Sequence, residues 1–481
     1  MLKKLTAWIE KNEGLILILL LVVVLRIPSL FEPYWYGDEG IYLVLGQALR
    51  KGLVFYRDIH DNKPPLLYLL AAIAGNVFYF RLILMVWFGI ATTVFFKLMQ
   101  VILPKKKAAW YGTTLAMIVL TTLLEGNVAN AEIFIVLPVV LAILLVAKKT
   151  KNWFGVGLLF SIGFLFKVPA AFDFAALVIW LMIFEKNRLR KIWSLGLGFI
   201  LPIIGTIIYY GVVGGMEPYV RSALLQNVGY LTSWQAGQQG SGGLMNRGII
   251  IAVFLTMFYP LAKKFKLSRW LSLMVIWFLL AMYGALLSER PYPHYLIQPA
   301  IPGVILLALF LYNKQKALKL VIITVGILSG WWCYQIKFWG YPIVPYYVNF
   351  VKYITQQRGL EEYRNYFDPR VNQAYQLGEY LKRSTLPQDR VFIWGDEPGV
   401  YALGERLPVG RYTVAYHVVD FNGYDETMQA WEKQPPKVVL VMDYEKRPFK
   451  EMELRLATDY VLAGKIDQAW VYRLLEGTPL R

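Results

Sequence analysis

The chain has 481 residues, of which 57% are hydrophobic and only 17% are charged, a balance that excludes an ordinary soluble protein. The apolar residues gather in blocks of about 15 to 22, roughly the length with which a helix crosses the hydrocarbon core of a bilayer. The formal net charge is +18. Because the basic clusters recur at the ends of apolar blocks, membrane topology and anionic headgroups account for this charge better than nucleic-acid binding. We expect an all-α polytopic membrane protein with no nucleic-acid partner.

About eleven transmembrane helices are expected. Short clusters of Lys and Arg fall between alternate blocks, so the positive-inside rule places these loops in the cytoplasm and every second loop outside. A further apolar segment, 64–79, is expected to lie on the outer surface, because a span there would put Lys105, Lys106 and Lys107 outside. The first block is too long for a cleaved signal peptide. The expected spans lie near 13–31, 81–103, 108–124, 132–147, 153–166, 169–184, 192–213, 248–262, 269–287, 295–312 and 317–334.

The composition predicts three regions. Residues 1–335 form a transmembrane domain whose outer loop, 32–80, carries the chemistry, and residues 336–375 form an interfacial connector. Residues 376–481 are expected to be a small α/β domain, with buried strands at 390–394 and 437–442. An odd number of spans places this domain outside the cytoplasm. The single cysteine, Cys333, allows no intramolecular disulfide and no cysteine metal site.

The stretch Tyr36–Leu70 concentrates charge directly after the first apolar block. It contains the adjacent acids Asp38 and Glu39, and the run His60-Asp61-Asn62-Lys63 followed by two prolines. So much charge at a bilayer face indicates a site of chemistry or binding.

External loops in this topology bring carboxylates and cations to one membrane face. A carboxylate at a desolvated interface can take a proton from an incoming hydroxyl, and cations stabilise a phosphate leaving group as its charge develops. The combination suits displacement of a lipid-linked phosphate from a sugar. The candidate carboxylates are Asp38, Glu39 and Glu132, and the candidate cations are Lys63, Lys167, Arg290 and His294.

The arrangement Asp38-Glu39-x-x-Tyr42, followed by Lys63-Pro64-Pro65, resembles the first external loop of the polyprenyl-phosphate-sugar-dependent glycosyltransferases. These GT-C-type enzymes include protein O-mannosyltransferases and the aminoarabinose transferases that modify lipid A. The resemblance covers roughly residues 10–335. It extends to Asn130-Ala131-Glu132, Lys167-Val168-Pro169, and Arg290 to Tyr295 with Gln298.

The resemblance implies roles for these residues. Asp38 would be the base on the acceptor hydroxyl, Glu39 would orient acceptor or donor, and Glu132 would be the second acid. The donor would be a sugar on a polyprenyl phosphate, transferred with inversion and without a required cofactor to a glycan, lipid or protein. The implied phosphate-binding residues are Lys63, Lys167, Arg290 and His294, and the implied substrate-binding residues are Tyr42, His60, Asp61 and Gln298.

Structural explanations compete with these roles. Asp38 and Glu132 are also what a helix N-terminus favours, and Lys63 and Lys167 suit a membrane interface. Histidines at 60, 294 and 417 lack the spacing of metal ligands, whereas a divalent ion held by Asp38 and Glu132 stays open. The alternative functions are a transporter or lipid flippase, and a lipid-linked glycan polymerase or ligase.

Overall fold

The computed structural model describes residues 2–103, 105–226 and 242–475. They divide into two compact units. Unit 1 comprises Met1–Ser29, Leu82–Ile208 and Leu224–Ile343, and unit 2 comprises Leu30–Arg81, Tyr209–Ala223 and Val344–Arg481. Each unit is therefore assembled from segments far apart in the sequence.

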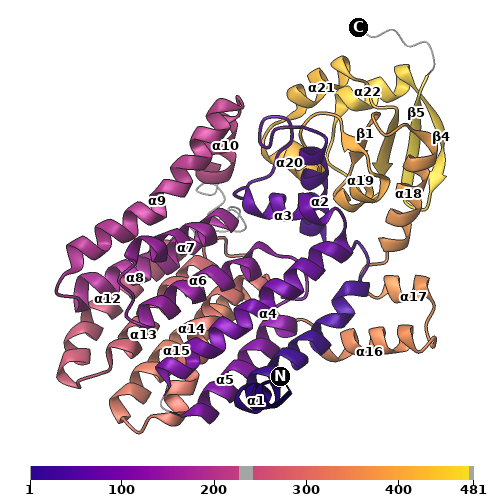
Figure 1. Cartoon of the computed structure of the whole chain (residues 1–481). Helices are drawn as coiled ribbons and strands as arrows, with labels where there is room; N and C mark the ends of the chain where they lie inside the picture. Colours follow the sequence, from indigo (N-terminus) through magenta and orange to yellow (C-terminus); the bar gives the residue numbers. More distant parts are fainter. Residues whose placement is uncertain (1, 104, 227–241, 476–481) are drawn as a thin grey trace. The chain divides into compact units, whose positions relative to one another are not determined.

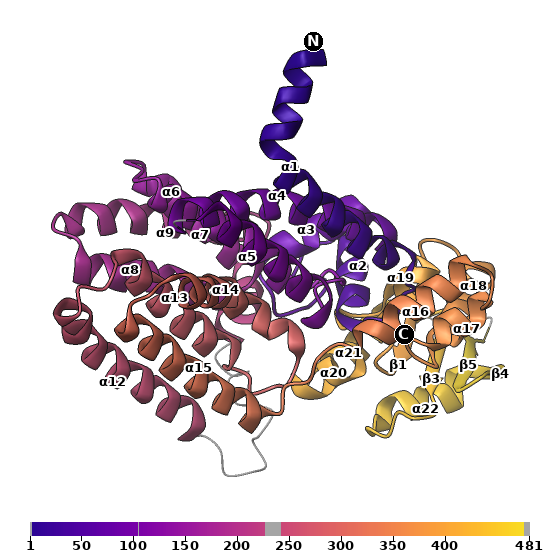
Figure 2. The same cartoon turned by 90° about the horizontal axis from the view of Figure 1, so that it is seen from below.

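Unit 1 is helical. The helices α12, α13, α14 and α15 pack in sequence-neighbouring pairs and run side by side (Figure 2), and α13 also packs on α8 while α6 packs on α7. Its helices are α1 (Leu2–Arg26), most of α4 (Val77–Ile102), α5 (Lys106–Ile118), α6 (Ala131–Ala147), α7 (Trp153–Phe166), α8 (Ala171–Phe184), most of α9 (Arg188–Val212), α12 (Gly242–Lys264), α13 (Arg269–Ala285), α14 (Ile297–Tyr312) and α15 (Lys316–Ile336). Short 3-10 or π turns flank them at η1 (Ile27–Phe31), η2 (Val119–Leu123), η3 (Val168–Ala170) and η6 (Pro293–Leu296).

Within the described residues, six helices are long and apolar enough to cross a membrane, and four shorter apolar helices accompany them. Every one of the eleven expected segments contains a helix, so the helical, multi-pass architecture is confirmed. The number of crossings stays a prediction. Many apolar side chains of α9 are exposed, Ile200 and Ile208 by half or more, which is typical of a helix that faces lipid rather than water.

Unit 2 contains the charged loop and the C-terminal region. The loop forms α2 (Gly37–Arg50) and α3 (Leu66–Ala74). These two helices touch closely, since a Cβ on Gly46 would lie 2.5 Å from Ala72 N. Further helices are α10 (Met216–Tyr219) with the π turn η4 (Val220–Leu225), α16 (Ile343–Ile354), α17 (Leu360–Asn365), α18 (Val371–Ser384), α19 (Pro398–Gly404), α20 (Ala415–Asp420), α21 (Tyr424–Lys433) and α22 (Lys450–Asp459).

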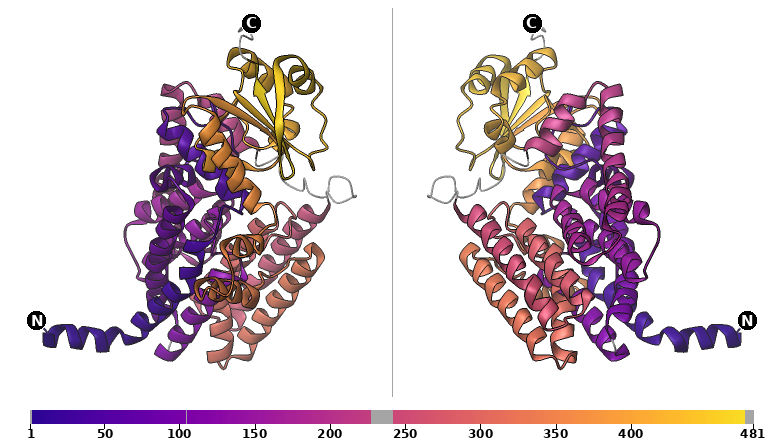
Figure 3. Two further views of the ribbon diagram at one scale, coloured as in Figure 1. Left: turned by 90° about the vertical axis from the view of Figure 1, so that its right-hand side faces the viewer. Right: turned by 90° about the vertical axis from the view of Figure 1, so that its left-hand side faces the viewer.

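A five-stranded mixed sheet forms the centre of the C-terminal region (Figures 1 and 3). The strands β1 (Arg390–Trp394) and β3 (Val438–Met442) pair in parallel, with Val391 opposite Val438. Both are continuous apolar runs, as expected for parallel strands covered on two faces. The strand order is β2-β1-β3-β5-β4, with β2 (Leu407–Pro408) parallel to β1, and β4 (Tyr460–Ile466) and β5 (Ala469–Leu474) antiparallel. The expected strands at 390–394 and 437–442 are thus present.

The loop 32–80 packs with the C-terminal region in unit 2, whereas the sequence assigned it to the transmembrane domain. Small residues make this packing close: a Cβ on Gly40 of α2 would lie 2.9 Å from Gly399 N of α19. The candidate residues therefore fall into two groups, one in each unit.

Candidate active site

Asp38 and Lys63 meet in unit 2 beside the N-terminus of α2. Lys63 Nζ lies 3.4 Å from Asp38 Oδ2, and the Tyr42 hydroxyl donates to the same oxygen at 2.8 Å. Asp38 and Tyr42 are four residues apart on one helix, so they share a face. The Asp38 side chain is 36% exposed, whereas that of Lys63 is 14% exposed. A carboxylate that solvent and substrate can reach therefore stands against a largely buried cation.

Asp61 and two tyrosines hold Lys63 in place. Asp61 Oδ2 lies 3.8 Å from Lys63 Nζ and accepts a hydrogen bond from the Tyr68 hydroxyl at 2.8 Å. The Tyr56 hydroxyl donates to the Lys63 carbonyl oxygen at 2.8 Å. Burial, and then the Asp61 charge, raise the pKa of Tyr68 well above its usual range, so its hydroxyl stays a donor. The ammonium position is thus set by fixed groups before any ligand binds.

His60 lies next to a histidine from the C-terminal region. The rings of His60 and His417 are 5.4 Å apart and nearly perpendicular, and His60 Nδ1 lies 3.3 Å from Ser222 Oγ. Burial, and then the neighbouring His417 and Arg411, lower the pKa of His60 well below its usual range, and burial also lowers the pKa of His417. Both imidazoles are therefore neutral at pH 7.

Glu39 points away from this cluster into the interior of unit 2. It pairs with Arg81. The Arg81 Nε–H donates a hydrogen bond to Glu39 Oε1 at 2.9 Å, and Nη2 contacts the second carboxylate oxygen. Arg81 Nη1 lies 3.1 Å from Glu32 Oε2, and the three side chains are almost completely buried. Glu32 in turn accepts hydrogen bonds from Trp35 and Tyr346. Glu39 thus anchors the first turn of α2, directly beside Asp38.

A second cluster of acids and bases lies in unit 1. Lys167 forms an ion pair with Glu132 at the start of α6 and lies 4.4 Å over the Tyr295 ring. His294 Nδ1 lies 2.7 Å from Glu125 Oε2, and its Nε2 lies 3.9 Å from Glu132 Oε1. The imidazole therefore stands between two carboxylates, and the side chains of Glu125, Glu132 and His294 are buried. The structure brings together Glu132, Lys167 and His294, three residues that the sequence analysis expected to converge.

Gln298 and Arg290 lie near this second cluster along the chain. Gln298 Nε2 donates to Asp173 Oδ2 at 2.8 Å and to the Pro169 carbonyl oxygen at 3.0 Å. Trp277 Nε1 donates to the other Asp173 oxygen at 2.6 Å. Arg290 is half-buried. The Gln298 amide therefore connects α14 to α8.

Several residues at the two clusters were not among the candidates: Tyr56, Tyr68, Glu125 and His417. The spacing of Tyr68 from Lys63, just past the two prolines, is the one local signal for it. Glu125 stands in an external loop of the expected topology, and its positive φ of 58° marks a tight turn. His417 carries no local signal, because its neighbourhood depends on packing between segments far apart in the sequence.

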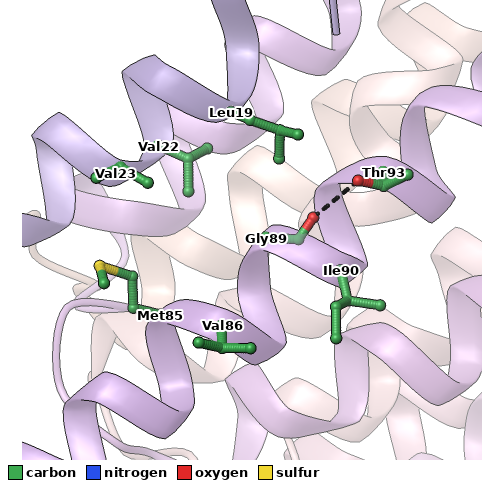
Figure 4. A pocket seen from close by; sticks show the side chains of 8 residues that line it. All are labelled: Leu19, Val22, Val23, Met85, Val86, Gly89, Ile90 and Thr93. Carbon is green, nitrogen blue, oxygen red and sulfur yellow. Dashed lines mark hydrogen bonds between the residues drawn. The ribbon is translucent and has the colours of Figure 1, made fainter. Parts of the chain in front are cut away.

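An apolar groove of about 350 Å³ lies between α1 and α4 in unit 1 (Figure 4). Leu19, Val22 and Val23 face Met85 and Val86 across it. Its polar side chain, Thr93, donates to the Gly89 carbonyl oxygen at 3.1 Å. The groove therefore offers apolar contact and no acid–base chemistry. Among the residues that the structure describes, no group of three or more His, Cys, Asp or Glu gathers as metal ligands.

No protein-family model and no curated protein sequence matches the chain. Two crystal structures of ArnT from Cupriavidus metallidurans do match it, both at 14% sequence identity. The apo structure gives a TM-score of 0.55 and covers 98% of each chain, and the structure bound to undecaprenyl phosphate gives 0.53 and covers 97% of this chain and 99% of ArnT.

The chain has the ArnT fold. ArnT is a lipid A aminoarabinose transferase of the GT-C type, so the GT-C resemblance of the sequence is confirmed at the level of the fold. The similarity extends over nearly the whole chain, including the C-terminal region, where the sequence motifs carried no resemblance beyond a small external appendage.

Proposed function

We propose that this chain is an integral-membrane glycosyltransferase that moves a sugar from a polyprenyl-phosphate donor to an acceptor hydroxyl. The observation that carries the proposal is the partly exposed Asp38 carboxylate held against the Lys63 ammonium. A base and a phosphate-binding cation side by side are what this displacement requires. The ArnT fold supports the donor class, because one ArnT structure holds undecaprenyl phosphate.

In the proposed reaction Asp38 takes the proton of the acceptor hydroxyl. The freed oxygen bonds to the anomeric carbon while the bond from that carbon to the phosphate oxygen breaks, and the polyprenyl phosphate leaves with the electron pair. Attack opposite the leaving group inverts the anomeric centre. Lys63 stabilises the charge that develops on the phosphate, and its fixed position means that little reorganisation is needed.

The remaining candidates take supporting roles in this proposal. Tyr42 and Asp61 hold Asp38 and Lys63, and Glu39 positions the first turn of α2 through Arg81. The cluster of Glu132, Lys167 and His294 supplies the second acid and further cations for donor or acceptor. His60, Arg290 and Gln298 are proposed to contact substrate.

We further propose that the acceptor site and the C-terminal region lie on the extracytoplasmic side, with about eleven crossings. The basic clusters at alternate helix ends support this orientation. A cysteine introduced at the exposed Glu361, in a chain with Cys333→Ser, should react with a membrane-impermeant maleimide in intact cells. Labelling only after the membrane is opened would reverse the orientation.

The proposed reaction needs no cofactor, because Lys63 supplies the positive charge at the phosphate. Transfer should therefore continue at an unchanged rate in excess EDTA. A loss of activity that Mg²⁺ or Mn²⁺ restores would favour the alternative of a divalent ion at Asp38 and Glu132.

The deciding experiment is transfer from radiolabelled glycosyl polyprenyl phosphates into membrane acceptors, comparing wild type with Asp38→Asn. Loss of the general base should lower kcat by about 10²- to 10⁴-fold, while donor binding stays close to that of wild type. Asp425→Asn, an exposed acid of the same unit, is the matched control and should transfer normally. Equal transfer by Asp38→Asn would remove the base assignment. Folded wild type that transfers from no donor would favour the flippase or ligase alternatives.

A further inference from the structure

A polar cavity lies in unit 2 at the C-terminal end of α2, away from Asp38. It has a volume of about 430 Å³, and it lies between the last turn of α2, the α3–α4 turn and the segment around α19. The residues that line it are Tyr34, Leu43, Gln47, Arg50, Lys51, Gly75, Asn76, Lys382, Pro387, Ala402, Leu403, Glu405 and Arg406. Asp38 and Lys51 are 13 positions apart, which is roughly 20 Å along a helix, so one phosphate cannot occupy both sites.

Positive charge dominates this cavity. Four of its lining residues are cations and one, Glu405, is an acid; Glu405 pairs with Lys382 at 2.6 Å. Lys51 Nζ donates to the carbonyl oxygens of Pro387 at 3.0 Å and Glu405 at 3.2 Å, which are two of the three hydrogen bonds an ammonium can make. Burial, and then the neighbouring Arg406 and Arg390, lower the pKa of Lys51. Cations are thus gathered where an anion would relieve their repulsion.

Gln47 is a second and independent sign of a ligand. Its side chain lines the cavity and is 6% exposed, and its Nε2 finds no acceptor among the residues that the structure describes. A buried amide without an acceptor costs about 1–3 kcal/mol. A phosphate oxygen entering the cavity would provide that acceptor.

Exposed apolar side chains lie close in sequence to two residues that line the cavity. Gly75 and Asn76 line the cavity in the turn between α3 and α4, and three apolar side chains within three residues of this pair are exposed. Ile73 is 76% exposed, Tyr79 52% and Phe78 43%. Exposed apolar residues next to cations are typical of a surface that lies at a membrane interface, and the sequence also indicated this position for 64–79.

We propose that this cavity binds the phosphodiester headgroup of an anionic phospholipid, with the lipid chains running along the apolar residues of the α3–α4 turn. Arg50 and Lys51 bind the phosphate, Gln47 donates to it, and Ile73 and Phe78 contact the chains. The site differs from the donor phosphate site and does not depend on any step of the transfer reaction. Its place at the end of α2 makes membrane lipid composition a determinant of how stably that helix is held.

The test is native mass spectrometry of the purified full-length protein in a neutral detergent, titrated with phosphatidylglycerol and with phosphatidylcholine of the same chain length. Wild type should bind phosphatidylglycerol about tenfold more tightly, because the choline ammonium of phosphatidylcholine is repelled by the cations that line the cavity. Arg50→Gln/Lys51→Gln should remove that preference. Lys433→Gln/Lys450→Gln removes the same charge from exposed positions of unit 2 and should leave it intact. If Arg50→Gln/Lys51→Gln does not fold, Lys382→Gln replaces it in the test, because Lys382 also lines the cavity but is exposed.

Equal affinity of wild type for the two lipids, or an unchanged preference in Arg50→Gln/Lys51→Gln, would overturn the proposal. Inorganic phosphate and glycerol phosphate are tested as soluble competitors of the lipid. If either competes phosphatidylglycerol away at an equal concentration, the site takes a free phosphate and the lipid assignment is overturned. Because lipid binding is measured without any sugar donor, its failure is distinguishable from failure of the glycosyltransferase proposal.

Discussion

Lys63 is the cation whose surroundings are most completely fixed, by Asp38, Asp61 and the Tyr42 ring 4.9 Å away. Lys63→Met should lower kcat/KM for the donor by about 10²- to 10³-fold, the usual cost of removing one preorganised charge-stabilising donor. Steady-state transfer measures this. Arg57→Gln, which removes an exposed charge from the same loop, should stay near wild type. Equal effects of the two variants would mean that the loop requires charge in general rather than Lys63.

His60 and His417 make stability depend on pH. Their pKa values are lowered in the folded protein, chiefly by burial. Below pH about 6.5 the unfolded chain therefore binds protons that the folded chain does not. The stability present above that pH is lost as the pH falls. The Tm of purified protein should fall between pH 7.5 and 5.5, and His60→Asn/His417→Asn should have a flatter profile. Parallel profiles would show that other groups cause the loss.

The contacts of side chains that depend on packing between distant segments could not be predicted from the sequence. Asp38 and Tyr42 could be placed together because residues four apart share a helix face. Glu39, one position along, points about 100° away and enters a buried ion pair with Arg81 that no local pattern shows. His417 likewise meets His60 only because α20 packs against the loop.

Among the elements, the helices were predicted well and their contacts were not. Apolar blocks of sufficient length specify the helices of unit 1, and short apolar runs specify β1 and β3. The assignment of loop 32–80 to unit 2 follows from close packing of α2 on α19 at Gly40 and Gly399. The chain has 38 glycines, so sequence alone does not identify the pair that meets.

The contact between α7 and α9 tests whether glycines allow two helices to pack closely. A Cβ on Gly198 would lie 2.1 Å from the Phe154 carbonyl oxygen, whereas nothing lies within 4 Å of a Cβ on Gly196. Gly198→Ala should therefore push the helices apart and cost about 1–3 kcal/mol. Gly196→Ala should be neutral or stabilising, because alanine favours a helix. Thermal unfolding in detergent compares them, and equal Tm values would contradict the close contact.

Across the molecule, unit 2 is held by buried charges from segments far apart in the sequence. Glu32 precedes α2, Glu39 lies in α2, and Arg81 lies near the start of α4. The Tyr346 hydroxyl of α16 donates a hydrogen bond to Glu32 at 2.5 Å. No local sequence pattern indicates this network, because each member is separated from its partners by a helix or more. The network joins residues 30–81 to 344–481, together with the packing of α2 on α19.

Arg81→Met should destabilise the protein by about 3–5 kcal/mol, because it removes the guanidinium that pairs with two buried carboxylates. Arg81→Met/Glu32→Gln/Glu39→Gln removes all three charges and should recover most of the lost stability. Thermal unfolding followed by tryptophan fluorescence gives the Tm of each variant. Arg383→Met, which breaks the exposed pair with Glu379, should change the Tm little, since exposed pairs contribute about 0–1 kcal/mol. A triple variant as unstable as Arg81→Met would show that hydrogen bonding, rather than charge balance, holds the network. Transfer by a stable triple variant would place Glu39 outside the chemical step, and loss of transfer at an unchanged Tm would place it within that step.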